Sequence, residues 1–393
     1  IMLTKLHCLS QQVRWVACIL TVLFLQYGNA LAFEKRVAKK TTGEPYPHIL
    51  KKETFTINTR NIKVLKENEN YLWIGTSNGL LRYDTQGKEE IKVYDNTNKL
   101  LSNGIFSIAI DKKGLPWVGT YGGGLSHFDG SHWKNQNTPD GLNDAFIYDI
   151  QFEKDNIWLA TWSGVNFSKW DSKDVWKSLT VENSNGGLID DWVYAVDIEK
   201  SGRVWFGTES GVSTYHKGEW KSFNHSKGLG APYEKVKQDN KAIMSLFQGQ
   251  HHATQASPAI PNIQTADYKP NYIVSMHLDK QNRLWIGTWG GGLSLLDTKN
   301  FTFRNFTTQE GLPGNFILAL EEDLAGKLWI GTNNGLSLFD GKTFQNFSRI
   351  NGLESKFIFS LESTKDHSLW IGGHKILTRI IIDPTTGIPL NIN

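Results

Sequence analysis

The pentapeptide Leu328-Trp329-Ile330-Gly331-Thr332 decides the fold, because variants of it recur along the chain. Seven such units occur, and their tryptophans are Trp73, Trp117, Trp158, Trp205, Trp285, Trp329 and Trp370. Successive tryptophans are 44, 41, 47, 80, 44 and 41 residues apart. A repeat of about 40–45 residues built from strands is typical of a β-propeller, in which blades surround a central axis.

The unit around Trp329 shows how one blade is built. An apolar run at 315–320 is followed by an acidic turn, the tryptophan strand, an alternating segment at 336–339 and a polar, aromatic segment at 342–347. Asp340-Gly341 is a strong hairpin signal between the last two. Four short strands and three tight turns predict an antiparallel blade. We therefore expect an all-β chain folded as a seven-bladed β-propeller of four-stranded antiparallel blades.

The repeated tryptophans are expected to be core residues that fill the space between blades, beside glycines that allow close approach. The seventh unit lacks an outer strand, whereas residues 53–58 resemble one that precedes the first complete unit. We predict that this N-terminal strand completes the last blade and closes the ring, which removes two open sheet edges. The expected propeller spans residues 53–383, after a linker at 33–52 and before a C-terminal tail at 384–393.

Residues 1–32 are typical of a cleavable signal peptide. Lys5 and Arg14 precede or flank an apolar run, and Ala30-Leu31-Ala32 fits a cleavage site after Ala32. An uncleaved anchor is the alternative, while the surroundings of Cys18 argue against lipidation. The sequence thus predicts a periplasmic or secreted protein.

Composition excludes several classes of site. Both cysteines, Cys8 and Cys18, lie in the signal segment, which excludes disulfides and thiolate chemistry in the mature chain. The formal net charge is +3, and without the charges of Lys5 and Arg14 it is +1. No basic stripe with interleaved aromatics is present, so nucleic-acid binding is not expected. We expect no cofactor and no metal, since the pair His251-His252 has no nearby carboxylate or cysteine.

The order Gly-Leu, polar turn, apolar strand, acidic turn, Leu-Trp-Ile-Gly-Thr and Gly-Leu resembles the two-component regulator propeller repeat, over roughly residues 54–382. The resemblance implies a periplasmic sensor region of a hybrid histidine kinase or diguanylate cyclase, linked in many members to polysaccharide use. The 393 residues contain no kinase, receiver or cyclase segment. We therefore expect signalling to require a membrane-bound sensor kinase or cyclase as partner.

In a propeller of this strand order, the loop into each innermost strand and the turn after each tryptophan strand lie at the same end. A flat apolar ring face with polar groups around it suits a sugar, and three aromatic residues stand where other units carry small or polar residues. The candidate ligand-binding residues are Tyr121, Trp162, Trp289, Arg60, Asn103, Asp144, Asp191, Glu209, Asn271, Asn315, Asn333 and Lys356. For the polar members, satisfaction of turn backbone groups is the competing interpretation.

The doubled step between Trp205 and Trp285 indicates an insertion at 230–270, whose first half, from Tyr233 to Phe247, could form a short helix. Long loops of this kind are functional elements or tolerated excursions. No catalytic motif is recognised, so the leading hypothesis is an exported, non-enzymatic sensor that binds an oligosaccharide or similar compound. The alternatives are a propeller lyase or hydrolase, with Asp144, Asp190, Asp191 or Glu209 as acid or base, and a protein-interaction scaffold that uses the insertion.

Overall fold

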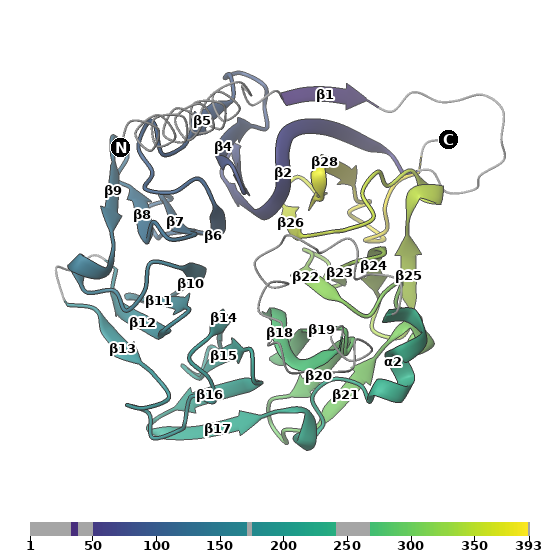
Figure 1. Ribbon diagram of the computed structural model, residues 1–393. Helices are drawn as coiled ribbons and strands as arrows, with labels where there is room; N and C mark the ends of the chain where they lie inside the picture. Colours follow the sequence, from purple (N-terminus) through teal and green to yellow (C-terminus); the bar gives the residue numbers. More distant parts are fainter. Residues whose placement is uncertain (1–32, 38–49, 171–174, 241–267, 392–393) are drawn as a thin grey trace, which may run out of the picture.

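The chain folds as a β-propeller, with antiparallel sheets arranged around a common centre (Figure 1). The computed structural model describes residues 33–37, 50–170, 175–240 and 268–391. The predicted signal peptide and most of the linker and the insertion, including His251-His252, lie outside the described residues. Among the helices that the structure describes, none has the length and apolar character needed to cross a bilayer.

Five blades are separate four-stranded sheets in which each strand pairs with the next along the chain. Their strands are β6 (Ile105–Ile110), β7 (Pro116–Thr120), β8 (Leu125–Phe128) and β9 (Trp133–Gln136); β10 (Ile147–Glu153), β11 (Asn156–Thr161), β12 (Gly164–Lys169) and β13 (Lys177–Leu179); β14 (Val193–Ile198), β15 (Val204–Thr208), β16 (Val212–His216) and β17 (Glu219–Phe223); β18 (Lys269–Leu278), β19 (Arg283–Trp289), β20 (Leu293–Asp297) and β21 (Phe303–Phe306); and β22 (Ile317–Glu322), β23 (Leu328–Thr332), β24 (Gly335–Phe339) and β25 (Phe344–Phe347).

The remaining strands form one eight-stranded sheet. They are β1 (Phe33–Val37), β2 (Lys52–Asn68), β3 (Tyr71–Thr76), β4 (Gly79–Asp84), β5 (Lys92–Tyr94), β26 (Ser360–Thr364), β27 (Ser368–Gly372) and β28 (His374–Ile381). Short helices complete the chain: η1 (Thr138–Asp140), η2 (His225–Lys227), η3 (Thr308–Glu310), η4 (Arg349–Asn351) and α2 (Tyr233–Asn240).

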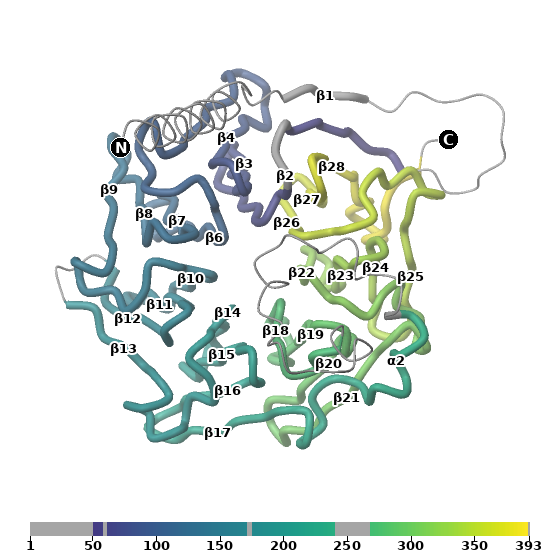
Figure 2. Tube along the Cα trace, in the orientation of Figure 1, coloured from purple at the N-terminus to yellow at the C-terminus, as the bar shows by residue number. Residues whose placement is uncertain are grey.

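The predicted count of seven separate blades is wrong, because β2 joins the first and last predicted units. Residues 52–56 of β2 pair with β28, and residues 62–68 pair with β3, with a register shift between. No glycine or proline interrupts these 17 residues, so one strand passes from an outer to an innermost position without a break. The tube in Figure 2 shows β28 returning to lie beside β2.

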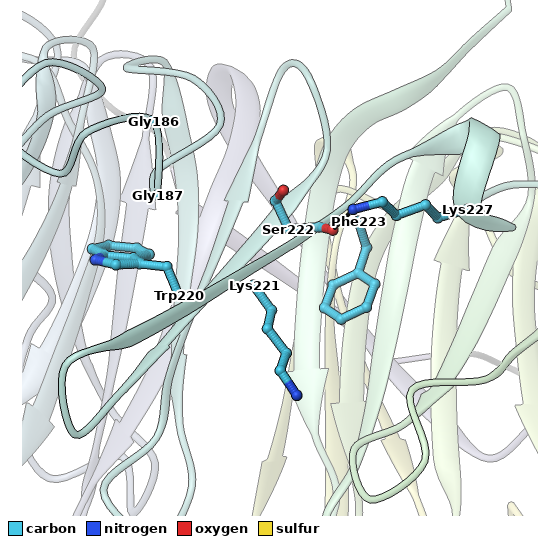
Figure 3. A pocket seen from close by; sticks show the side chains of 7 residues that line it. All are labelled: Gly186, Gly187, Trp220, Lys221, Ser222, Phe223 and Lys227. Carbon is cyan, nitrogen blue, oxygen red and sulfur yellow. Dashed lines mark hydrogen bonds between the residues drawn. The ribbon is translucent and has the colours of Figure 1, made fainter.

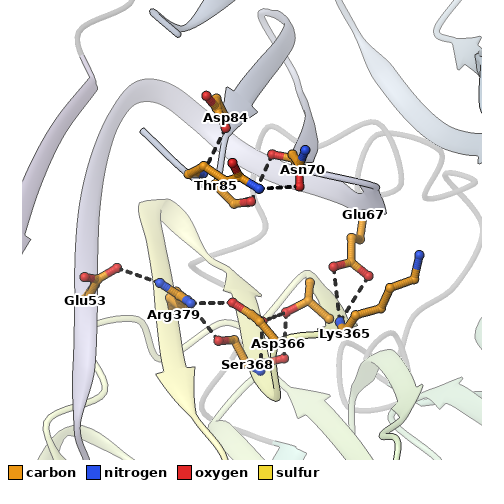
Figure 4. Close-up of polar contacts among 11 residues, drawn as sticks. Glu53, Glu67, Asn70, Asp84, Thr85, Lys365, Asp366, Ser368 and Arg379 are labelled. Atoms are coloured by element: carbon orange, nitrogen blue, oxygen red, sulfur yellow. Dashed lines mark hydrogen bonds and ion pairs between the residues drawn. The ribbon is translucent and has the colours of Figure 1, made fainter. Parts of the chain in front are cut away.

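Side chains reinforce the pairing of β2 with the end of the chain (Figure 4). Arg379 of β28 donates from Nη1 to Glu53 at 3.2 Å and from Nε to Ser368 Oγ at 2.9 Å, and it also pairs with Asp366. The Glu67 carboxylate accepts the backbone N–H of Lys365 at 3.1 and 3.2 Å. The predicted pairing of the N-terminal strand with the last strands is therefore present.

All seven repeated tryptophans are buried, as predicted, with at most 9% of each side chain exposed. In four blades the indole N–H donates to a carboxylate six residues earlier, in the turn before the tryptophan strand. These pairs are Trp117 with Asp111 (3.1 Å), Trp205 with Glu199 (3.0 Å), Trp285 with Asp279 (2.9 Å) and Trp329 with Asp323 (3.0 Å). The acidic turn and the tryptophan thus act as one unit.

In six of the seven tryptophan strands, a glycine two residues after the tryptophan allows the next blade to approach. A Cβ added at Gly287 would lie 2.8 Å from Cγ2 of Ile317, the first residue of the next innermost strand, which is too close for a real contact. The same glycine–isoleucine contact joins five other neighbouring units: Gly75 to Ile105, Gly119 to Ile147, Gly207 to Ile273, Gly331 to Ile358 and Gly372 to Ile62. The repeated glycine therefore sets the spacing between blades.

Candidate functional site

The polar residues predicted to enter the innermost strands hold the preceding turns in place. The side-chain oxygens of four of them accept a backbone N–H from the segment that follows an outer strand. The pairs are Asn103 with Asn96 (2.7 Å), Asp191 with Val181 (2.7 Å), Asn271 with His225 (2.6 Å) and Asn315 with Thr308 (3.0 Å). These bonds match the turn-satisfying interpretation, and a ligand role for the four residues stays a prediction.

Asp144 and Asp190 occupy equivalent positions in neighbouring blades. Asp144 accepts the N–H of Phe146 at 2.9 Å and the hydroxyl of Ser163 at 2.6 Å. Asp190 accepts the N–H of Trp192 at 3.0 Å and the hydroxyl of Ser210. Both carboxylates therefore tie the entry of an innermost strand to the turn after the tryptophan strand of the same sheet.

The other polar candidates are spread around the same end of the ring. Asn333 is buried and accepts the N–H of Phe316 at 3.3 Å, whereas Lys356 is exposed. Glu209 pairs with Lys269 at 3.3 Å across two sheets. The side chain of Arg60 lies outside the described residues.

A β-bulge at the start of each innermost strand turns one side chain toward the neighbouring blades. In six strands the pairing register shifts across this position, as between Ile147 and Asp149 of β10. The bulge residues are Lys63, Phe106, Tyr148, Tyr194, Val274 and Leu318, and Phe359 follows Ile358 in the same way. Bulges commonly re-aim side chains at functional sites.

Aromatic rings from these bulges and from the flanking loops form one continuous set, here named the aromatic arc. Its neighbouring ring centroids are 4.6–6.3 Å apart, within the range of favourable aromatic contacts. The arc consists of Phe106, Tyr121, Phe146, Tyr148, Trp162, Trp192, Tyr194, Tyr272, Trp289 and Phe316. It runs from β6 through the β10, β14 and β18 sheets to the entry of β22.

All three aromatic candidates from the sequence belong to the arc. Tyr121 contacts Phe146, Trp162 stacks on Trp192 at 5.4 Å, and Trp289 stacks on Tyr272 at 5.9 Å. The three side chains are half-buried. The structure therefore brings Tyr121, Trp162 and Trp289 into one surface, while it gives most polar candidates bonds within turns.

Sequence reasoning missed the arc members on the innermost strands and missed Lys63. Their signal was the residue after each aligned isoleucine or valine, such as Phe106 after Ile105 and Tyr148 after Ile147. Strand alternation assigns such a residue to the sheet face opposite its neighbour. Because a bulge is not visible as a pattern in one strand, these residues read as ordinary strand positions.

The tyrosines at the centre of the arc stay protonated. Burial raises the pKa of Tyr194 and of Tyr272, and the nearby Glu209 carboxylate adds to both effects. A hydrogen bond from the Tyr272 hydroxyl to that of Tyr194 raises the pKa of Tyr272 further. The hydroxyls are thus neutral groups that can donate and accept hydrogen bonds among the rings.

Charged groups occupy the other end of the innermost strands. Lys66 pairs with Glu362 at 3.1 Å, and the Glu362 carboxylate also accepts the N–H of Glu67 at 2.8 Å. Asp149, Asp197 and Glu321 likewise accept the N–H of Val196 (2.9 Å), Leu278 (2.6 Å) and Ser363 (3.1 Å) in the next sheet. Burial raises the pKa of Asp149 to about 6. These carboxylates connect neighbouring innermost strands.

His277 lies among these carboxylates. Burial alone would lower the pKa of His277, but the Glu322 carboxylate, 3.7 Å from Nε2, and the charges of Asp197 and Glu321 raise it overall. The group as a whole is thus internally paired, since each charge faces an opposite charge or a backbone donor.

A hollow of about 380 Å³ lies along the outer strand β17, away from the arc (Figure 3). Trp220 packs against Gly187 at one end, and a Cβ at Gly187 would lie 2.4 Å from the indole. Lys227 donates to the Ser222 carbonyl at 2.7 Å, and Lys221 extends over the ring of Phe301. Both lysines that line this hollow, Lys221 and Lys227, therefore contact neighbouring protein groups.

The insertion begins and returns beside the arc. Its first part forms α2, as predicted within 233–247, and Lys235 of α2 pairs with Glu310 of η3 at 3.0 Å. At its base, the Ala231 N–H donates to Gly291 O at 2.8 Å, next to Trp289, and the Tyr268 hydroxyl donates to Ala231 O at 2.6 Å. Residues 241–267 are outside the described residues.

Known proteins contain repeats similar to those of this chain. The family model described as two component regulator propeller matches residues 267–290 and 311–334. Histidine kinase P4 of Formosa agariphila is 24% identical over 239 residues, which are 58% of this chain and 15% of that protein. The chain thus spans about a seventh of the length of this curated relative.

Solved structures share the fold. The extracellular domains of two putative hybrid two component systems from B. thetaiotaomicron superpose with TM-scores of 0.66 and 0.60, at 20% and 17% identity. They match 91% and 90% of this chain but only 42% and 40% of theirs. Virginiamycin B lyase from Staphylococcus aureus gives a TM-score of 0.56 at 12% identity, over 88% of this chain and 99% of the lyase.

At such identities, these structural likenesses establish the fold alone. The match to the family model concerns the tryptophan repeats themselves, and it agrees with the turn, strand and glycine pattern described above. The chain is a β-propeller, and its repeats at 267–290 and 311–334 match the two component regulator propeller model.

Proposed function

We propose that this propeller is the sensor part of a two-component signalling system and binds a small ligand, most suitably an oligosaccharide, on the aromatic arc. The arc itself carries the proposal. Seven of its ten rings are partly exposed and offer flat apolar faces, whereas Tyr194, Tyr272 and Phe316 are buried. Burial raises the pKa of the partly exposed Tyr148, so this residue adds a neutral hydroxyl that can donate and accept hydrogen bonds. Such a surface suits the alternating apolar faces and hydroxyls of sugar rings.

The signalling role rests on the relatives. The curated relative is a histidine kinase, and the similar structures are extracellular domains of hybrid two component systems. We therefore infer a periplasmic or extracellular location, reached with the predicted signal peptide, and a membrane-bound sensor kinase or cyclase as the partner that responds to ligand binding.

We also infer that the eight-stranded sheet does the work of two blades, which would make the ring equivalent to seven. Residues 52–56 of β2 supply the fourth strand beside β26, β27 and β28, and residues 62–68 begin the next four strands. A ring closed through one continuous strand would hold the arc at a fixed geometry, because the ends of the arc lie on sheets either side of this joint.

The test is a thermal-shift screen of residues 33–393 against neutral and acidic oligosaccharides, with each sugar recovered afterwards by mass spectrometry. Stabilisation with intact ligand is the expected result, because a ligand that binds only the folded state raises its stability. Recovery of a cleaved sugar would instead support the lyase or hydrolase alternative.

Variants then locate the site. Trp162→Leu and Trp289→Leu should each weaken binding by about fivefold, since a lost stacking contact costs on the order of 1 kcal/mol. Trp170→Leu is the matched control, because Trp170 packs on Phe152 at the other end of its sheet. If all three variants bind the ligand with the same affinity, the arc is not the binding surface.

A further inference from the structure

Lys63 is the one positively charged residue among the bulge positions of the described innermost strands. It follows Ile62 in β2, where the neighbouring strands carry Phe106 and Phe359. Its Nζ lies 5.7 Å from the centroid of the Phe106 ring and 5.8 Å from that of Phe359. The ammonium group therefore sits between two aromatic rings at the edge of the aromatic arc, which begins at Phe106.

No carboxylate of the described residues pairs with Lys63. The acidic side chains of the adjoining segments have other partners: Glu354 pairs with Lys52 at 3.2 Å, and Glu362 pairs with Lys66. Apart from Glu354, the described ionisable residues at this end of the seventh repeat are Lys356, His374 and Lys375, which add no negative charge. Among the described residues, the charge of Lys63 is therefore stabilised by the faces of the Phe106 and Phe359 rings and by no carboxylate.

Lys66, on the same strand, provides a comparison within the protein. The Glu362 carboxylate at 3.1 Å raises the pKa of Lys66, so its charge is stabilised in the folded chain. Burial lowers the pKa of Lys63 to about 8, and no carboxylate of the described residues offsets this effect. Holding a desolvated ammonium without a counter-ion costs free energy, and such groups are concentrated at functional sites.

We infer that Lys63 binds an acidic substituent, a carboxylate or a sulfate ester, of the ligand whose ring faces stack on the aromatic arc. This inference rests on the proposed function and specifies its ligand class as acidic saccharides. An anion on Lys63 replaces the missing counter-ion, and Phe106 contacts both Lys63 and the arc members Tyr121 and Tyr148. One ligand can therefore reach the cation and the stacking surface together.

The experiment compares matched acidic and neutral sugars on the full chain by isothermal titration. The probes are a galacturonic acid trimer with its methyl ester, and a sulfated galactose oligomer with its unsulfated form. At least one acidic member should bind about tenfold or more tightly than its neutral partner, because only the acidic sugar can accept a charge-assisted hydrogen bond from Lys63. The carboxylate and sulfate arms distinguish the two sources of negative charge.

Lys63→Met should abolish this preference while leaving the affinity for the neutral sugar unchanged. The variant keeps the apolar stem and removes a buried charge, so its thermal midpoint should be equal to or above that of the wild type. Lys112→Gln is the control, because Lys112 lies in the turn after β6, at the opposite end of the strand from the arc, and pairs there with Asp155. It should change neither affinity.

Three outcomes are informative. Neutral sugars that bind as tightly as acidic ones, or a preference that survives in Lys63→Met, would overturn the inference while leaving the proposed function intact. Absence of binding by both members of both pairs, under conditions where the chain is folded, would count against the inference and the proposed function alike. A preference that disappears only in Lys63→Met would establish the acidic subsite.

Discussion

The bond between the buried indole of Trp329 and Asp323 makes a quantitative prediction about stability. Asp323 accepts the indole N–H at 3.0 Å and the backbone N–H of Lys327 at 2.9 Å. Trp329 is fully buried and Asp323 is 4% exposed, so the indole has no access to water once the carboxylate is removed. A buried unsatisfied donor costs about 1–3 kcal/mol, and hydrogen bonds to a charge are at the upper end.

Asp323→Ala should therefore lower the free energy of unfolding by about 2–4 kcal/mol, measured by urea titration with tryptophan fluorescence and circular dichroism. The matched control is Asp340→Ala, in the turn between β24 and β25 of the same blade. Asp340 also accepts two backbone N–H groups, from Lys342 and Thr343 at 2.8 Å, but it is exposed, so water can replace it. This control should cost far less.

A double-mutant cycle with Trp329→Phe isolates the indole bond. Phenylalanine keeps most of the apolar ring but lacks the N–H, so adding Asp323→Ala should then cost about 1–2 kcal/mol less than it does in the wild type. If Asp323→Ala costs the same in both backgrounds, or no more than Asp340→Ala, then the carboxylate does not stabilise the blade through the tryptophan and the reasoning is refuted.

Three further predictions concern the ring as a whole. Deleting residues 50–58, which include strand pairs with β28, should lower the thermal midpoint sharply, whereas deleting 33–37, which pair only with β2, should lower it little. At one junction Ala160 replaces the glycine and Val193 replaces the isoleucine that faces it in the other repeats. Val193→Ile should therefore destabilise the fold, because the larger side chain meets the Ala160 methyl group. Adding Ala160→Gly should restore stability. Folding raises the pKa of Asp149 from 3.8 to about 6, so the folded state retains a proton that the unfolded state loses. The free energy of unfolding should therefore fall as the pH rises from 4 to 6. In urea titrations at several pH values, Asp149→Asn should lose less stability than the wild type over that window.

The blade architecture was predictable because its determinants repeat. Each tryptophan, its glycine and the turn residues serve the same local geometry, so seven copies reinforce one interpretation of the sequence. The continuity of β2 was not predictable, since Asn58-Thr59-Arg60 reads as a loop between an outer and an innermost strand. Whether a polar tripeptide without glycine or proline bends or stays extended depends on its partners on both sides.

The candidate site was predictable only in part. Tyr121, Trp162 and Trp289 stood out because they differ from the residues at equivalent turns, and the structure joins them in the aromatic arc. Asn103 and Asn315 lie in the predicted turns but bond to backbone groups, which sequence could not decide. Lys63 was missed because it stands out through the lack of a paired carboxylate among the described residues, and that depends on how separate strands meet.

These outcomes share one physical cause. Positions that fill the space between blades are constrained in most repeats: the glycine–isoleucine contact occurs at six junctions, and the indole bond to a carboxylate occurs in four repeats. The bulge residue is not constrained in this way. It is lysine, phenylalanine, tyrosine, valine or leucine in different innermost strands, although the pairing register shifts at the same position in each of them. Because the fold leaves these side chains free to differ, differences among them can be selected for binding alone, and Lys63 is the one charged residue at these positions of the described strands.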